Sequence, residues 1–253
     1  MRVELLPSCQ PAGDAQFLVS YVIDDAVAID AGSLGLLADL DRQRRVRHVF
    51  ITHEHLDHIA TLPIFLENVY EPGPDCVEVL AGEAVMDYLD VDVFNDRVWP
   101  DFFALSAGDD RFLQGTVIEP GVTVERAGVS FTPVPVSHAL STLGLIVDDG
   151  RSVVVVPSDT GPTEAIWRQA AATGRVVATF LECSFPAALA DLAARVGHLS
   201  TVTFAAEVAK LPRGVRVIVV HRKARYADAI ARELAALALP GVELVRPGFT
   251  YEF

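Results

Sequence analysis

The sequence predicts an α/β fold in which two mixed sheets pack face to face and helices cover their outer sides, a four-layer αβ/βα sandwich. Short apolar stretches alternate along the chain with stretches whose apolar residues recur at helical spacing. Several of the predicted strands are apolar throughout, as in strands that are buried on both faces. No linker-like run divides the chain, so we expect residues 1–253 to form a single domain.

The first half of the chain is predicted to be rich in strands. A hairpin is expected around Asp24-Asp25, and a strong apolar strand precedes a group of histidines. In chain order the predicted elements are strands 17–23, 26–29, 46–51 and 77–80, a short helix over 82–89, and a second hairpin made of strands 122–127 and 129–136.

The second half is predicted to alternate strand and helix more regularly. Asp149-Gly150 is typical of a two-residue hairpin turn, and Pro240-Gly241 follows the end of a helix. In chain order the predicted elements are strands 142–147 and 152–156, helix 163–172, strand 176–182, helices 186–195 and 200–211, strand 215–220, helix 227–237 and a last strand over 242–253.

Composition restricts the partners and the setting of the protein. Acidic residues outnumber basic ones 34 to 20, which gives a net charge of −14 and argues against a long nucleic acid as partner. The first residues lack the apolar segment of a signal peptide, and no apolar run is long enough to cross a membrane. The cysteines Cys9, Cys76 and Cys183 are too far apart for a disulfide framework, so we expect a reduced, cytoplasmic setting.

The strongest local signal follows the predicted strand 46–51 and reads THEHLDH over residues 52–58. In an extended segment the side chains of His53 and His55 point to one side, and Asp57 and His58 follow where the chain turns toward a helix. Three imidazoles and a carboxylate suit divalent zinc, manganese or iron. A polar surface loop with scattered histidines is the alternative, but four such residues directly after a buried strand favour a metal site.

The pattern HxHxDH after a strand resembles the signature of the metallo-β-lactamase superfamily. The resemblance implies the αβ/βα sandwich and two divalent metal ions, zinc before manganese or iron. It also implies further ligands at the ends of apolar strands, with Asp159 bridging the two metals. One metal would be held by His53, His55 and His138, and the other by Asp57, His58 and His221.

Four segments resemble the class II cyclic-nucleotide phosphodiesterases within that superfamily. They are HEHLDHIATLPIFLENVY at 53–70, FNDRVWPDF at 94–102, LECSFP at 181–186 and GHLS at 197–200, and they occur in the family's order. The chain departs from the family at Thr61, where glycine or serine is usual. It also reads HRKA after residue 220, where the family often has HLKP. These departures affect the expected substrate preference more than the chemistry.

The resemblance implies hydrolysis of 3′,5′-cyclic AMP or GMP to the 5′-nucleotide by a hydroxide that bridges the two metals. The candidate catalytic residues are Asp57, Asp159 and His198. We expect His198 to protonate the leaving 3′ oxygen or to bind a phosphate oxygen. A structural role for His198 at the entry to a helix is the alternative.

Asn95, Trp99 and His198 are the candidate substrate contacts. Trp99 and Phe102 could stack on a purine, or they could belong to a packed loop or a subunit contact. The resemblance implies a small phosphodiester substrate, a cyclic nucleotide, and a homodimer.

Other functions remain open at this point. The main alternative is a promiscuous phosphoester, sulfate-ester or lactone hydrolase on the same di-metal site. The acidic composition argues against a tRNA-processing nuclease, and the complete ligand set argues against a binding protein with structural metals.

Overall fold

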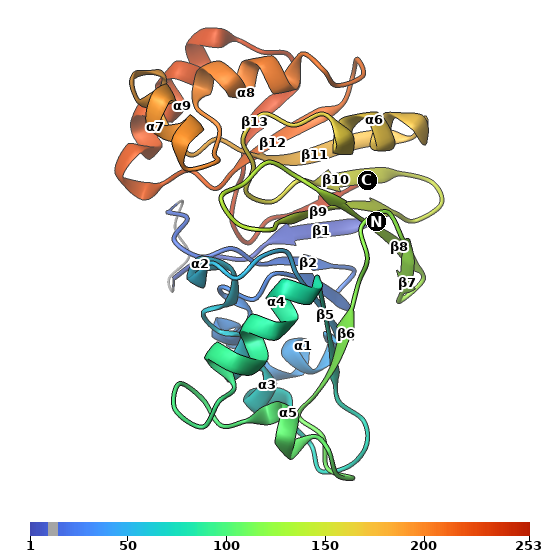
Figure 1. Ribbon diagram of the computed structural model, residues 1–253. Helices are drawn as coiled ribbons and strands as arrows, with labels where there is room; N and C mark the ends of the chain where they lie inside the picture. The colour runs from blue at the N-terminus through green and yellow to red at the C-terminus, as the bar shows by residue number, and fades with distance from the viewer. Residues whose placement is uncertain (10–14) are drawn as a thin grey trace.

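Two seven-stranded sheets lie face to face in the computed structural model, which describes residues 1–9 and 15–253 (Figure 1). The helices α1 to α5 accompany the sheet drawn in the lower half of the view, and α6 to α9 accompany the upper one. We call these the first and the second sheet. The predicted αβ/βα sandwich is confirmed, and its description as a single domain stays a prediction.

The first sheet takes its strands from the first half of the chain and from residues 250–252. In order of pairing they are β14 (Thr250–Glu252), β1 (Arg2–Leu5), β2 (Tyr21–Ile23), β3 (Val27–Ile29), β4 (His48–Ile51), β5 (Val77–Ala81) and β6 (Leu113–Val117). The accompanying helices are η1 (Leu34–Leu36), α1 (Leu40–Arg45), α2 (Leu56–Ile59), α3 (Leu62–Val69), α4 (Glu83–Tyr88), η2 (Leu89–Val93) and α5 (Phe102–Leu105).

The second sheet is built from residues 124–244. In order of pairing its strands are β7 (Val124–Arg126), β8 (Val129–Pro135), β9 (Leu143–Asp148), β10 (Val153–Val156), β11 (Val176–Glu182), β12 (Arg216–Val220) and β13 (Val242–Leu244). Its helices are α6 (Ala165–Ala172), η3 (Ala187–Leu189), α7 (Ala190–Arg195), α8 (Thr201–Val208), η4 (Ala224–Tyr226) and α9 (Ala227–Leu237).

The two sheets have the same pairing pattern. From β14 in the first and from β7 in the second, three antiparallel pairs are followed by three parallel pairs. Strands β3, β4 and β5 therefore correspond to β10, β11 and β12. Parallel neighbours end at the same edge of a sheet, so the loops that follow them gather there.

Apolar side chains fill three layers, one between the sheets and one between each sheet and its helices. Between the sheets, Phe50 of β4 stacks on Phe131 of β8 with 4.5 Å between ring centroids. Phe65 of α3 and Trp167 of α6 are buried in the two outer layers. Among the helices of residues 1–9 and 15–253, none combines the length and the apolar character needed to cross a bilayer.

Two sequence predictions are wrong. Residues 242–253 do not form one strand, because β13 and β14 lie in different sheets and are separated by Pro247 and by Gly248, which has φ 79°. The second half also does not alternate strand and helix more regularly than the first, since α1 to α5 connect the parallel strands of the first half just as α6 to α9 do in the second. These helices have four to eight residues, so they show little more than two turns of apolar periodicity.

Candidate metal centre

Four candidate ligands of the first half lie on one short segment that runs from the end of β4 through α2. His53 follows β4 in the extended segment and is fully buried. His55 occupies the position before α2 with extended backbone angles, and Asp57 and His58 lie in the single turn of that helix. The change from extended to helical backbone aims the two pairs of side chains in different directions.

The candidate ligands of the second half come from three separate strand ends. His138 follows β8, Asp159 follows β10, and His221 follows β12 directly. His221 has φ 52° and Ser158, beside the aspartate, has φ 60°. Positive φ is uncommon for residues with a side chain, and such strain concentrates at functional sites.

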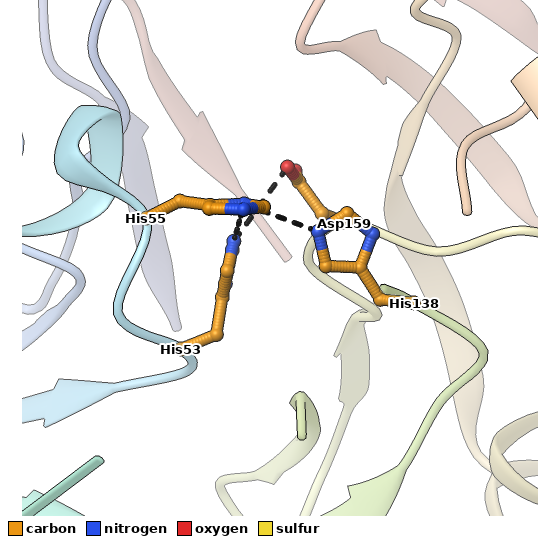
Figure 2. A group of neighbouring side chains, drawn as sticks. All are labelled: His53, His55, His138 and Asp159. Atoms are coloured by element: carbon orange, nitrogen blue, oxygen red, sulfur yellow. Dashed lines mark hydrogen bonds and ion pairs between the residues drawn. The ribbon is translucent and has the colours of Figure 1, made fainter. Parts of the chain in front are cut away.

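His53, His55, His138 and Asp159 converge on one point (Figure 2). The Nδ1 of His55 lies 3.1 Å from His53 Nε2 and 3.2 Å from His138 Nε2. Asp159 Oδ2 lies 3.7 Å from His53 Nε2. One ligand atom from each residue lies within 4.8 Å of all the others, a spacing that suits one shared cation.

A second group meets the other oxygen of the same aspartate. His221 Nε2 lies 3.1 Å from Asp57 Oδ2 and 3.4 Å from Asp159 Oδ1. His58 Nε2 also lies 3.4 Å from Asp159 Oδ1. The two carboxylate oxygens of Asp159 therefore face two different groups of side chains.

In the first half, the ring nitrogens of His58 and His53 that face away from the ligand cluster contact a buried carboxylate and a hydroxyl. His58 Nδ1 donates to Asp30 Oδ2 at 2.7 Å, and His53 Nδ1 lies 3.0 Å from Thr52 Oγ1. Asp30 also accepts from the backbone N–H of Thr52 at 2.8 Å. Such outer contacts fix the orientation and tautomer of a ligating imidazole, leaving its other nitrogen free.

In the second half, the outer partners are a carbonyl and a hydroxyl. His138 Nδ1 donates to the carbonyl of Gly197 at 2.8 Å, and His221 Nδ1 lies 2.9 Å from Ser184 Oγ. Gly197 has φ 70°, and a Cβ there would lie 2.9 Å from His138 Cα, so glycine is required at this contact. His198 Nε2 also points into the site and lies 3.9 Å from Asp159 Oδ2.

Burial and mutual proximity set the protonation states. Burial, reinforced by the neighbouring His58, lowers the pKa of His53 to about 2, and burial also lowers the pKa of His55 and of His138. Burial alone would raise the pKa of Asp159, but His221 and His58 hold that pKa well below its usual range. These directions favour neutral imidazoles at His53, His55 and His138 and an ionised Asp159, the forms that bind metals. Burial alone would lower the pKa of His58, but Asp159 and Asp30 raise it.

The donor set fits divalent metal ions. His58 Nε2 is buried and makes no hydrogen bond to any residue in 1–9 or 15–253, although it points at Asp159. A buried nitrogen without a hydrogen bond is costly unless another partner satisfies it. Imidazole nitrogens and carboxylate oxygens are ligands of zinc and of similar divalent ions.

The structure brings together eight side chains that the sequence singled out. They are His53, His55, Asp57, His58, His138, Asp159, His198 and His221.

Asn95 and Trp99 have other neighbours. Asn95 hydrogen bonds within its own loop, and Trp99 packs in the layer between the first sheet and its helices. Phe102 is buried there as well, which supports the packed-loop alternative. Substrate contact by Asn95 and Trp99 stays a prediction.

Three residues of the site were not identified from sequence: Asp30, Glu182 and Ser184. Asp30 directly follows β3, and Glu182 is the last residue of β11. Both carboxylates are fully buried, and Glu182 accepts hydrogen bonds from His198 Nδ1 at 2.7 Å and from Ser184 Oγ at 2.7 Å. An acidic residue at the end of an otherwise apolar strand was the available signal.

A two-sheet αβ/βα sandwich with a histidine and aspartate cluster at the strand ends defines the metallo-β-lactamase-like class of proteins. Residues 28–222 match the family described as the beta-lactamase superfamily domain, and the chain belongs to this family. The membership predicted from the HxHxDH pattern is confirmed.

Curated relatives are named as cyclic-nucleotide phosphodiesterases. The chain is 30% identical over 105 residues to 3′,5′-cyclic-nucleotide phosphodiesterase 1 of Saccharomyces cerevisiae, covering 34% of this chain and 28% of the relative. It is 25% identical over 235 residues to the probable 3′,5′-cyclic-nucleotide phosphodiesterase of Yersinia pestis, covering 78% of this chain and 66% of the relative. The matched part thus spans less than two thirds of these relatives.

Solved structures share the fold at low identity. Unliganded yeast PDE1 superposes with a TM-score of 0.75 at 18% identity and 98% coverage of both chains. Human tRNase Z, short form, superposes with a TM-score of 0.68 at 16% identity, covering 100% of this chain and 99% of that one. At such identities the likeness concerns the fold alone.

Proposed function

We propose that the protein is a metal-dependent hydrolase that opens the phosphodiester of 3′,5′-cyclic nucleotides to 5′-nucleotides. The observation that carries the proposal is the position of Asp159, whose two carboxylate oxygens face two separate groups of ligand atoms. The curated relatives named as cyclic-nucleotide phosphodiesterases support the choice of substrate.

Two divalent ions, zinc before manganese or iron, would be held by the two groups. His53, His55 and His138 would bind one ion, and the other would be bound by the second group, Asp57, His58 and His221, with Asp159 shared. When bound, such ions neutralise phosphate charge and lower the pKa of water to roughly 7. The protein's own part is to hold the ligand nitrogens in place through Asp30, Thr52, Gly197 and Ser184.

His198 would deliver the proton to the leaving 3′ oxygen. Its Nδ1 is held by Glu182, so the proton available for transfer sits on Nε2, which faces Asp159. Burial alone would lower the pKa of His198, but Glu182 raises it, which favours the protonated imidazole that a proton donor needs. The helix-entry role is taken by Ser200, whose side chain caps α8.

A broader esterase activity on the same site is the second candidate. Asp57 keeps one third of its side chain exposed (33%), so the site opens to solvent. An open site accepts phosphoesters, sulfate esters and lactones of varied shape. The homodimer and the cytoplasmic setting stay predictions.

The test is turnover by zinc- or manganese-loaded protein. We expect hydrolysis of 3′,5′-cyclic AMP with kcat/KM above ~10⁴ M⁻¹s⁻¹, in the ordinary range for an enzyme acting on its own substrate. Bis(p-nitrophenyl) phosphate and a lactone are measured beside it. Weak turnover of cyclic AMP beside strong turnover of the other esters would move the function to the broader hydrolase.

A further inference from the structure

A cavity of about 440 Å³ lies at the edge of the first sheet where β5 and β6 end. Its walls are the start of α4, the residues after β6, and the loop between β8 and β9 that carries His138. The lining residues used below are Gly82, Glu83, Val117, Glu119, Ser141 and Leu143.

One wall of this cavity, Ser141 and Leu143, belongs to the chain segment that follows the candidate ligand His138. The N–H of Leu143 donates to the carbonyl of Thr52 at 3.1 Å, and Thr52 directly precedes His53. Ser141 lies three residues after His138. Strands β4 and β5 run in parallel with Ile51 opposite Ala81, so the residue after β5 lies beside the start of the histidine loop.

Gly82 lines this space and brings no side chain into it. It directly follows β5 as His221 directly follows β12, the corresponding strand of the second sheet. A Cβ at Gly82 would lie 3.3 Å from Leu143 Cδ1, closer than an ordinary contact. After β5 the chain therefore has a glycine beside a cavity, whereas after the corresponding strand β12 it has the candidate ligand His221.

The side chains that line the cavity suit the nucleoside end of a phosphodiester substrate better than its phosphate. Val117 exposes 53% of its surface beside Leu143 and offers an apolar wall. The side chains of Glu83 and Glu119 are exposed and, within residues 1–9 and 15–253, their carboxylates form neither hydrogen bonds nor ion pairs. Free carboxylates repel phosphate and accept hydrogen bonds from amines, whereas the metal centre attracts phosphate.

We propose that this cavity holds the nucleoside end of the substrate, with Glu83 and Glu119 accepting hydrogen bonds from the exocyclic amine of its purine base. The volume lies in the range of small-molecule sites, ~300–1,000 Å³. The proposal rests on the proposed function and adds the orientation of the substrate and its preference for bases that carry an amine.

The test fills the cavity and removes its charges separately. Ala84→Trp places an indole at the wall from the exposed side of α4, and Ala171→Trp on α6 is the matched control in the other helix layer. We expect Ala84→Trp to lower kcat/KM for cyclic AMP at least ~10-fold and to leave methyl p-nitrophenyl phosphate turnover unchanged.

The double variant Glu83→Gln/Glu119→Gln tests base recognition. We expect it to reduce the preference for cyclic AMP over the cyclic phosphate of purine riboside, which lacks the amine, by about tenfold. Both glutamates are exposed, so this variant should fold even if Ala84→Trp does not.

Binding of 5′-AMP to zinc-loaded protein, measured by calorimetry, separates the two proposals. Equal turnover of cyclic AMP by Ala84→Trp and Ala171→Trp would contradict nucleoside binding in the cavity and would leave the proposed function unaffected. Binding of 5′-AMP that Ala84→Trp abolishes, without turnover of cyclic nucleotides, supports the cavity and overturns the function. A wild-type protein that neither binds 5′-AMP nor hydrolyses cyclic AMP overturns both.

Discussion

The two halves of the molecule share one strand pairing pattern, yet they supply the metal centre in different ways. The first half places four ligand candidates on one short segment that runs from the end of β4 through α2. The second half supplies His138, Asp159 and His221 from the ends of three different strands. The ligands of the first set are neighbours in sequence, whereas the second set meets only through the packing of the whole second sheet.

Asp159→Ala should have the largest effect, because this residue faces both groups. We expect turnover to fall by more than ~10³-fold, which corresponds to about 4 kcal/mol of barrier. Metal content, measured by mass spectrometry, should fall as well. Asp110→Ala, at an exposed position, is the control, and an active Asp159→Ala enzyme would contradict the bridging role.

His198→Ala tests whether the second half supplies more than ligands. We expect kcat for cyclic AMP to fall by ~10²–10⁴ with unchanged metal content, since a general acid is removed. The loss should be much smaller for bis(p-nitrophenyl) phosphate, whose leaving group needs no proton. An equal loss for both substrates would argue against proton donation.

Asp30→Asn and Glu182→Gln compare the two buried carboxylates that support the site. Asp30 holds His58 in the first half, so its substitution should weaken metal binding by ~10–100-fold. Glu182 holds His198, so its substitution should mainly lower kcat for cyclic AMP. Competition with a chelator measures metal affinity, and steady-state kinetics measures kcat. Equal losses of metal affinity and of kcat in both variants would show that the two carboxylates do not have different roles.

Glu78→Gln should give the smallest effect, and it probes the contact between the sheets. Arg126 of β7 donates to Glu78 of β5 at 2.5 and 2.7 Å, and His48 and Thr116 also face this carboxylate. The hydrogen bond from Arg126 lowers the pKa of Glu78 to about 2. At pH 7 we expect a loss of about 1–2 kcal/mol in the free energy of unfolding.

The pH dependence of that loss has a defined sign. A folded-state pKa below the unfolded value of roughly 4.3 gives stability that is complete above that pH and disappears as pH falls toward 2. The difference between wild type and Glu78→Gln in urea unfolding should therefore shrink over that interval. Glu125→Gln, at an exposed neighbouring position, is the control, and a difference that is constant with pH would contradict the assignment.

The sequence predicted the parts of the molecule that are encoded over short, continuous stretches. The bounds of β11 and α9 agree with the predicted 176–182 and 227–237, because both have strong periodicity and clear ends. The histidine segment was identifiable because its four candidate ligands lie within six consecutive residues. Asp30 and Glu182 are single acidic residues whose histidine partners, His58 and His198, lie 28 and 16 positions away, so spacing along the chain carried no signal for these pairs.

The dispersed ligands needed the resemblance to a family before they could be identified. His138, Asp159 and His221 each stand alone in sequence, and their meeting depends on which strands are neighbours. The separation of β13 from β14 and the cavity beside Gly82 are also properties of sheet assembly. Local propensity does not report such long-range arrangements.

Strand β14 closes the first sheet by pairing with β1, and the N–H of Phe253 donates to the carbonyl of Met1 at 2.9 Å. On the ribosome the amino-terminal residues emerge first. The edge of β1 that pairs with β14 therefore stays unpaired until residues 250–252 have been synthesised. The second sheet can pair all its strands earlier, from residues 124–244. Contacts over such long sequence separations form slowly. The first sheet, whose ligands are contiguous in sequence, is therefore the later of the two to complete its strand pairing.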